Sequence, residues 1–195
     1  MLADAGYDVW LANFRGNKYS KNHLSLEVMT PEFRDFGWEE HAVYDIPAFT
    51  SFILGKTGYK KLAYISHSMG TTAAFFALSL NNTFYQDKWS LVVAMAPPLS
   101  LSSISSPLFN ILAHKANYYF ISLILNYFHI YEIFPANWLN QGFFKYACSY
   151  VPQFCRLGNY LLADYDPGQN DDTATKVYFA HFPSGSSVKQ VGHFA

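Results

Sequence analysis

The chain has 195 residues, of which 51% are hydrophobic, 19% are aromatic and only 14% are charged. This length and apolar content fit one domain, or one domain with a subdomain, and argue against disorder over most of the chain. The formal net charge is −1 and no block of Lys and Arg occurs, so nucleic acid is not expected as a partner.

The N-terminal part begins with a short expected strand at residues 7–11, followed by an irregular polar loop over residues 18–35. Apolar residues at helical spacing then predict a helix from about Trp38 to Leu54. Pro47 should start or kink the second half of this helix, and Gly55 should end it.

A strand–turn–helix–strand pattern follows. Residues 60–65 predict a strand, residues 66–70 a sharp turn, and residues 71–80 a helix that is apolar nearly all round and therefore expected to be buried. Residues 91–95 predict a second, continuously apolar strand. Unbroken apolar strands alternating with helices indicate a parallel sheet covered on both faces, which places the fold in the α/β class.

The pattern changes after the second of these strands. A serine-rich stretch leads into an aromatic-rich region without strand–helix alternation, which predicts a helical insertion. A polar loop is expected at residues 164–175, and the tail from residue 176 to 195 begins like a strand or an extended segment. The sequence thus predicts an α/β core over residues 1–98 and a helical cap region over residues 99–195.

No membrane-spanning segment is expected. Residues 1–6 have neither a basic n-region nor a long apolar h-region, so no signal peptide is expected in this chain. The longest apolar stretch, residues 117–134, contains Asn126, His129 and Glu132, whereas a span needs roughly 20 mostly apolar residues. We therefore expect this stretch to form a buried or lipid-facing helical subdomain.

Two further features concern possible covalent modification. Cys148 and Cys155 form neither a CxxC motif nor part of a four-ligand zinc set, and from their spacing they are either two buried thiols or a local disulfide. The tripeptide Asn81-Asn82-Thr83 makes Asn81 a candidate glycosylation site. Neither a metal site nor a cofactor is expected.

The turn after the first of the two apolar strands carries the candidate chemistry. Residues 66–70 approximate the G-x-S-x-G elbow, in which a strained strand-to-helix turn exposes a nucleophilic serine, here Ser68. The backbone N–H of Met69 would then point to the position of an oxyanion. Ser66 replaces the first Gly of the motif, and His67 should point away from the nucleophile. The alternative interpretation is an ordinary βα turn with a capping serine.

Several segments occur in one order that is typical of a known family. They are LADAGYDVWL (2–11), RGN (15–17), YDIPA (44–48), KTG (56–58), the elbow with Thr71 and Thr72, and HFPSGSSVKQ (181–190). Together they resemble the acid lipases, the gastric and lysosomal lipase group, over essentially the whole chain. The resemblance is weakest through residues 100–145.

This resemblance implies an α/β-hydrolase fold with a helical cap, usually in a secreted or lysosomal protein. It implies a lipase or carboxylic ester hydrolase of lipid catabolism, acting on neutral lipid esters through a serine nucleophile and an acyl-enzyme, with possible lipid-interface contact through the cap. It places the nucleophile at Ser68, one oxyanion donor at Met69, and the cap disulfide of the family at Cys148 and Cys155. Which ester is the substrate stays open.

The resemblance also places part of the machinery outside these residues. Members of the family have a second oxyanion donor upstream, and their catalytic Asp and His lie on loops of later strands. His181, His193 and the aspartates at 164–172 match other positions, so the triad Asp and His are not expected in this chain. We therefore expect an internal fragment with absent or weak activity of its own. The alternative is a non-catalytic α/β-hydrolase fragment that binds lipid or a partner.

Overall fold

The computed structural model describes residues 2–99, 106, 109–111, 114–162, 171–182 and 184–193. The chain divides into two compact units. Unit 1 comprises Met1–Arg15 and Gly37–Leu99, and unit 2 comprises Gly16–Phe36 and Ser100–Ala195. The sequence placed residues 16–36 with the core, whereas the structure groups them with the C-terminal part.

Unit 1 opens with a 3₁₀ turn, η1 (Ala3–Ala5), and an extended segment. Residues 7–11 form no strand, because no described strand pairs with them, and the side chain of Leu11 is 88% exposed. The strand expected there is therefore absent from the described part of the chain.

The helical stretch of unit 1 consists of α1 (Trp38–Glu40), the π-helical turn η2 (His41–Asp45) and α2 (Ile46–Thr57). Pro47 lies in the first turn of α2, directly after the π-helical turn η2, which confirms the expectation that it starts or kinks the second half of the helix. The expected end at Gly55 is wrong. The helix runs on until Gly58 adopts a left-handed conformation (φ 74°) and donates its N–H to the carbonyl of Leu54.

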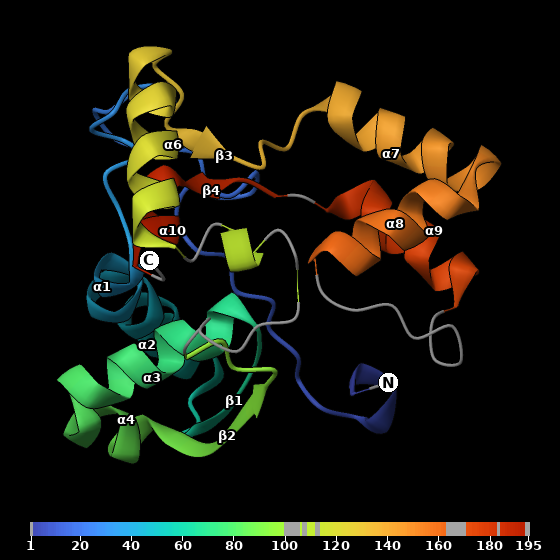
Figure 1. Ribbon diagram of the computed structural model, residues 1–195. Coiled ribbons are helices and arrows are strands. Elements are labelled where there is room, and N and C mark those ends of the chain that lie inside the picture. The colour runs from blue at the N-terminus through green and yellow to red at the C-terminus, as the bar shows by residue number, and fades with distance from the viewer. Residues whose placement is uncertain are drawn as a thin grey trace. The chain divides into compact units, whose positions relative to one another are not determined.

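The sheet of unit 1 has two described strands, β1 (Leu62–His67) and β2 (Trp89–Met95). They run parallel and are joined by α3 (Met69–Leu80) and α4 (Asn82–Lys88), as Figure 1 shows. This βαβ arrangement confirms the predicted parallel pairing, and its register sets His67 opposite Met95. The carboxyl ends of both strands therefore lie side by side, and the end of β1 is immediately before Ser68, which is the residue that precedes α3.

Helix α3 is only partly buried, contrary to expectation. Its small residues Ala73, Ala74 and Ala77 are buried, whereas Phe75 and Phe76 are exposed. Small side chains let the helix pack closely on the elements beneath it, and the described residues do not cover its opposite face.

Aromatic residues hold the other elements of unit 1 together. The rings of Tyr64 and Trp89 stack with their centroids 4.4 Å apart, and Trp89 donates its indole N–H to Thr50 Oγ1 at 3.3 Å. The hydroxyl of Tyr85 donates to the carbonyl of Ala42 at 3.1 Å, and burial raises the pKa of Tyr85 to about 12. These contacts connect η2 with α4, α2 with β2, and the two strands with each other.

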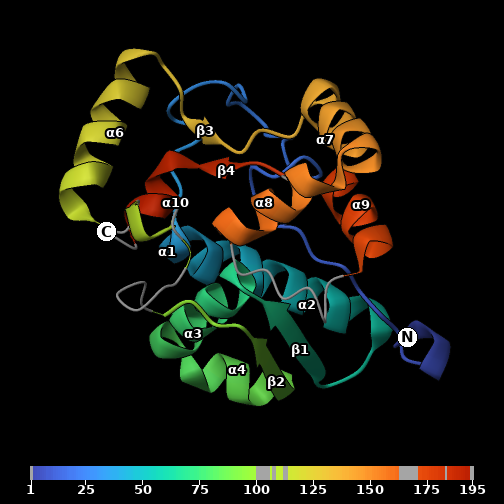
Figure 2. The same ribbon diagram turned by 45° about the vertical axis from the view of Figure 1, so that its right-hand side comes forward.

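Unit 2 is mainly helical (Figure 2). Its elements are α6 (Lys115–Tyr127), β3 (Glu132–Ile133), α7 (Trp138–Tyr150), α8 (Pro152–Leu162), α9 (Asp172–His181), β4 (Ser186–Ser187) and α10 (Val188–Gly192). The strands β3 and β4 pair antiparallel. None of the described helices is long and apolar enough to cross a membrane.

The expectations of a loop through residue 175 and of a strand-like start to the tail at residue 176 are wrong, because α9 occupies residues 172–181. The side chain of Asp171 accepts a hydrogen bond from the Thr173 N–H at 2.8 Å and so caps this helix. Residues 164–170 of the expected loop lie outside the described part.

Polar contacts attach residues 16–36 to the rest of unit 2. Arg34, 2% exposed, forms an ion pair with Glu132 of β3 at 2.7 Å, and Lys21 reaches the same carboxylate at 2.9 Å. The N–H of Lys18 donates to the carbonyl of Ser184 at 2.9 Å. Each of these residues lies at least 98 positions from its partner in the sequence, so no local pattern predicts the contacts.

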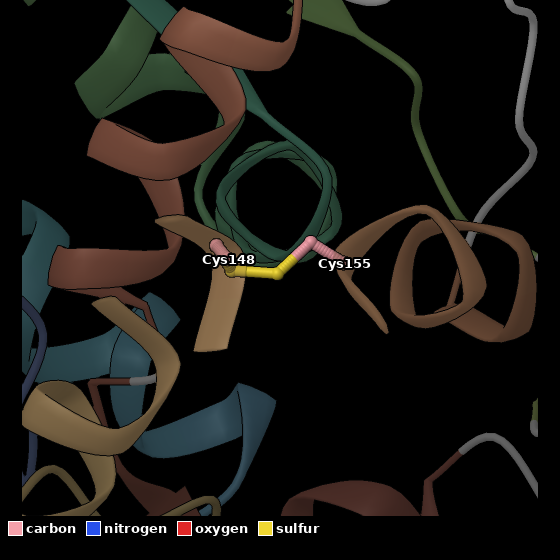
Figure 3. Close-up of a disulfide and its surroundings, with 2 residues drawn as sticks. All are labelled: Cys148 and Cys155. Carbon is pink, nitrogen blue, oxygen red and sulfur yellow. A yellow bond between two sulfur atoms is a disulfide. The ribbon is translucent and has the colours of Figure 1, made fainter. Parts of the chain in front are cut away.

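Cys148 of α7 and Cys155 of α8 form a disulfide (Figure 3). Their Cα atoms lie 5.4 Å apart, both residues are buried, and Phe182 packs against them. Of the two interpretations that the spacing allowed, the structure contains the disulfide.

Candidate active site

Ser68 lies between the end of β1 and the start of α3, as the elbow motif predicts. Its backbone has φ 49° and ψ −120°, a region that residues with a side chain rarely occupy. Such a conformation costs about 1–3 kcal/mol and persists only where the surroundings fix it. A strained serine at the carboxyl end of a parallel strand has the geometry of a nucleophile elbow.

Hydrogen bonds hold both main-chain polar groups of Ser68. Its N–H donates to the carbonyl of Met95, the last residue of β2, at 2.9 Å. Its carbonyl accepts from the Thr71 N–H at 2.8 Å and from Thr71 Oγ1 at 2.5 Å. With its backbone fixed in this way, the half-buried Ser68 has a defined direction for its side chain.

The residues that flank Ser68 have the positions expected from the motif. The Met69 N–H belongs to the first turn of α3, where backbone amides have no acceptor within the helix and the helix dipole favours negative charge. A Cβ placed on Gly70 would lie 3.3 Å from Ser66 Cβ, so the turn requires small residues on both sides of the serine. Ser66 fits, but its buried hydroxyl has no hydrogen-bond partner among the described residues.

The two described histidines of unit 1 do not bond to Ser68. His67 is exposed at the end of β1, and His41 in η2 directs its Nδ1 to Asp45. His181 bonds through its ring to the carbonyl of Val177 within α9, and Asp171 caps the same helix. His193 is exposed after α10.

Unit 1 also contains a partly buried cluster of polar and charged side chains that the sequence did not predict. Asp45 accepts hydrogen bonds from Arg15 Nε at 2.8 Å and from the Arg15 N–H at 3.1 Å, and it lies 2.9 Å from His41 Nδ1. The ring of Phe14 stacks on His41 at 4.4 Å. Burial alone would raise the pKa of Asp45, but the hydrogen bonds from His41 and Arg15 outweigh it and lower this pKa. The i,i+4 spacing of His41 and Asp45 was the only local signal.

Within the described residues, no group of three or more His, Cys, Asp and Glu side chains could hold a metal ion. The first turn of α3 presents backbone N–H groups that have no acceptor within the helix, and such groups suit a negative charge on oxygen.

Comparison with known proteins agrees with this geometry. Residues 1–180 match the family described as alpha/beta hydrolase fold. The chain is similar to lipase member K of Homo sapiens (35% identity), gastric triacylglycerol lipase of Bos taurus (36%) and lysosomal acid lipase/cholesteryl ester hydrolase of Macaca fascicularis (33%). Each match covers 100% of this chain and 48% of the relative. The chain therefore spans about half the length of the curated relatives it matches.

Proposed function

The chain belongs to the alpha/beta hydrolase fold family, and from this premise we propose that it contributes the nucleophile elbow of a lipase that hydrolyses carboxylic esters of neutral lipids. The observation that carries the proposal is the strained Ser68 between β1 and α3 in a chain similar to lipases along its whole length. The names of these relatives support a lipid ester as the substrate class.

In the proposed mechanism, Ser68 Oγ attacks the carbonyl carbon of the ester while a histidine base takes the hydroxyl proton. The Met69 N–H donates to the oxyanion of the tetrahedral intermediate. The intermediate collapses, the alcohol leaves with the proton returned by the histidine, and an acyl-serine remains. Water, activated by the same histidine, then releases the fatty acid and regenerates Ser68.

The base, its carboxylate and a second oxyanion donor are proposed to come from outside residues 1–195, as the resemblance to acid lipases implies. A serine hydrolase without its triad partners retains only about 10³–10⁴-fold acceleration over water, which comes from oxyanion and binding groups. We therefore propose that the 195 residues alone turn over lipid esters weakly or not at all.

Unit 2 is proposed to act as the helical cap that receives the acyl chain and meets the lipid surface. Helix α6 supports this role because it exposes large apolar side chains, namely Tyr119, Phe120, Leu123 and Ile124. Monomeric soluble proteins rarely expose large contiguous apolar patches without a binding role.

A secreted or lysosomal location is proposed, and the Cys148–Cys155 disulfide supports it because disulfides persist in oxidising compartments. Asn81 is the proposed glycan acceptor. It is exposed, and its side-chain oxygen accepts from the Phe84 N–H at 3.2 Å and so caps α4. A glycan attaches to the amide nitrogen, which leaves this capping oxygen in place.

The proposal is tested on the product of the natural gene, alongside the 195-residue chain, with p-nitrophenyl esters of increasing acyl length. Ser68→Ala should lower hydrolysis of long-chain esters by at least about a thousandfold. Ser79→Ala, which changes an exposed serine near the end of α3, should leave the rate unchanged. A Ser68→Ala product that retains its rate would exclude the mechanism. Ester binding without turnover by the natural product would favour the non-catalytic alternative.

A further inference from the structure

The side chain of Thr71 contacts the elbow in a way that the proposed mechanism does not use. Its Oγ1 donates to the Ser68 carbonyl at 2.5 Å, in addition to the bond from its own N–H at 2.8 Å. Thr71 is fully buried. We infer that Thr71 is a positioning residue, whose hydroxyl holds Ser68 in the conformation from which Oγ reacts. The inference rests on the proposed role of Ser68 as the nucleophile.

The need for such a contact follows from the backbone of Ser68. The dihedral angles φ 49° and ψ −120° set the direction of the Cα–Cβ bond, and a serine without further contacts relaxes out of this region. The Met95 carbonyl fixes the N–H side of the residue. On the carbonyl side, the nearest donors are the N–H and the hydroxyl of Thr71, while the Thr72 N–H lies farther away at 3.4 Å.

Threonine in a helix often donates to a carbonyl three or four residues earlier. The bond from Thr71 Oγ1 could therefore be an ordinary helix contact, with no role in positioning Ser68. The neighbouring Thr72 distinguishes the two interpretations. It lies in the same first turn and is also buried, but its Oγ1 donates to the carbonyl of Pro98 at 3.2 Å rather than to Ser68. The two hydroxyls thus differ in whether they act on Ser68.

The test compares Thr71→Val, Thr71→Ser and Thr72→Val with the unchanged chain. Valine keeps the shape of threonine but removes the hydroxyl, and serine keeps the hydroxyl. The first readout is the hydrogen-exchange rate of the Ser68 amide, measured by NMR, because this amide reports on the bond to Met95 and needs no catalysis. We expect about tenfold faster exchange in Thr71→Val, restoration in Thr71→Ser, and no change in Thr72→Val.

The second readout is the rate of Ser68 modification by a fluorophosphonate in the product of the natural gene. Thr71→Val should slow it by about tenfold, Thr71→Ser should restore it, and Thr72→Val should leave it unchanged. Equal effects of the two valine variants, or no effect of Thr71→Val on exchange, would overturn the inference. Failure of the unchanged protein to react at Ser68 would instead overturn the proposed function, and the exchange rates would still decide the role of Thr71.

Discussion

The crowding between Ser66 and Gly70 leads to a quantitative prediction about the elbow. A Cβ on Gly70 would lie 3.3 Å from Ser66 Cβ, closer than the roughly 3.5–4.0 Å of a favourable carbon–carbon contact. Ser66 has little room to move, because it pairs with Ala94 in the β1–β2 ladder. Gly70→Ala should therefore strain the turn.

Two opposing contributions determine how much Gly70→Ala changes the free energy of unfolding. Overpacking costs about 1–3 kcal/mol, whereas replacing glycine by alanine in a helix stabilises by up to about 1 kcal/mol. Gly70→Ala should thus lower the free energy of unfolding by about 1 kcal/mol. In a Ser66→Gly background the close contact is gone, and the same change should raise it by up to about 1 kcal/mol. The coupling between the two positions is therefore about 2 kcal/mol.

Urea unfolding of the four proteins, followed by circular dichroism, measures this coupling. Gly55→Ala in α2 is the matched control, because a Cβ there meets nothing within 4 Å and the change should stabilise both backgrounds equally. Crowding between the two positions is excluded if Gly70→Ala changes the free energy of unfolding by the same amount, within about 0.5 kcal/mol, in the unchanged chain and in the Ser66→Gly background.

Asp45→Asn should lower the free energy of unfolding at pH 7 by about 1–3 kcal/mol, since it weakens hydrogen bonds to a charged group. The pKa of Asp45 is lowered in the folded state, so its contribution to stability is present above the unfolded pKa of about 3.9 and is lost as pH falls through the folded pKa. Between pH 7 and pH 2, the free energy of unfolding should therefore fall less in Asp45→Asn than in the unchanged chain. An equal fall in both proteins would contradict this prediction. Replacing both Cys148 and Cys155 by Ala should cost about 2.5 kcal/mol in urea unfolding, as the entropy of an eight-residue loop predicts, and an unchanged midpoint would argue against it. In a secretory host, removal of N-glycans should lower the mass of the chain; Thr83→Ala should abolish this shift while Thr83→Ser keeps it, and a shift that survives Thr83→Ala would exclude Asn81 as the acceptor.

The sequence predicted the elbow and its surroundings well because their signals are local. Apolar strands, a small-residue turn and a helix follow one another within 36 positions of the printed sequence, from residue 60 to residue 95. The strands β1 and β2 and the helix α3 confirm this order, but the turn is shorter than predicted, because only Ser68 lies between β1 and α3. The strained backbone of Ser68 gives the motif its geometric counterpart.

The predictions from sequence that the structure did not confirm failed for identifiable physical reasons. Gly55 did not end its helix, because a glycine inside a helix is tolerated and Gly58 provides the left-handed cap. The attachment of residues 16–36 to unit 2 depends on Arg34 and Glu132, two charges 98 positions apart. Burial of a charged pair depends on tertiary contacts that no local periodicity reveals.

Whether Ser68 is the nucleophile can be decided by mapping the site of fluorophosphonate attachment with mass spectrometry in the product of the natural gene. We expect one phosphonylated peptide that carries the label on Ser68, with loss of the label in Ser68→Ala and retention in Ser79→Ala. Attachment at another residue, or an unchanged extent of labelling in Ser68→Ala, would contradict it.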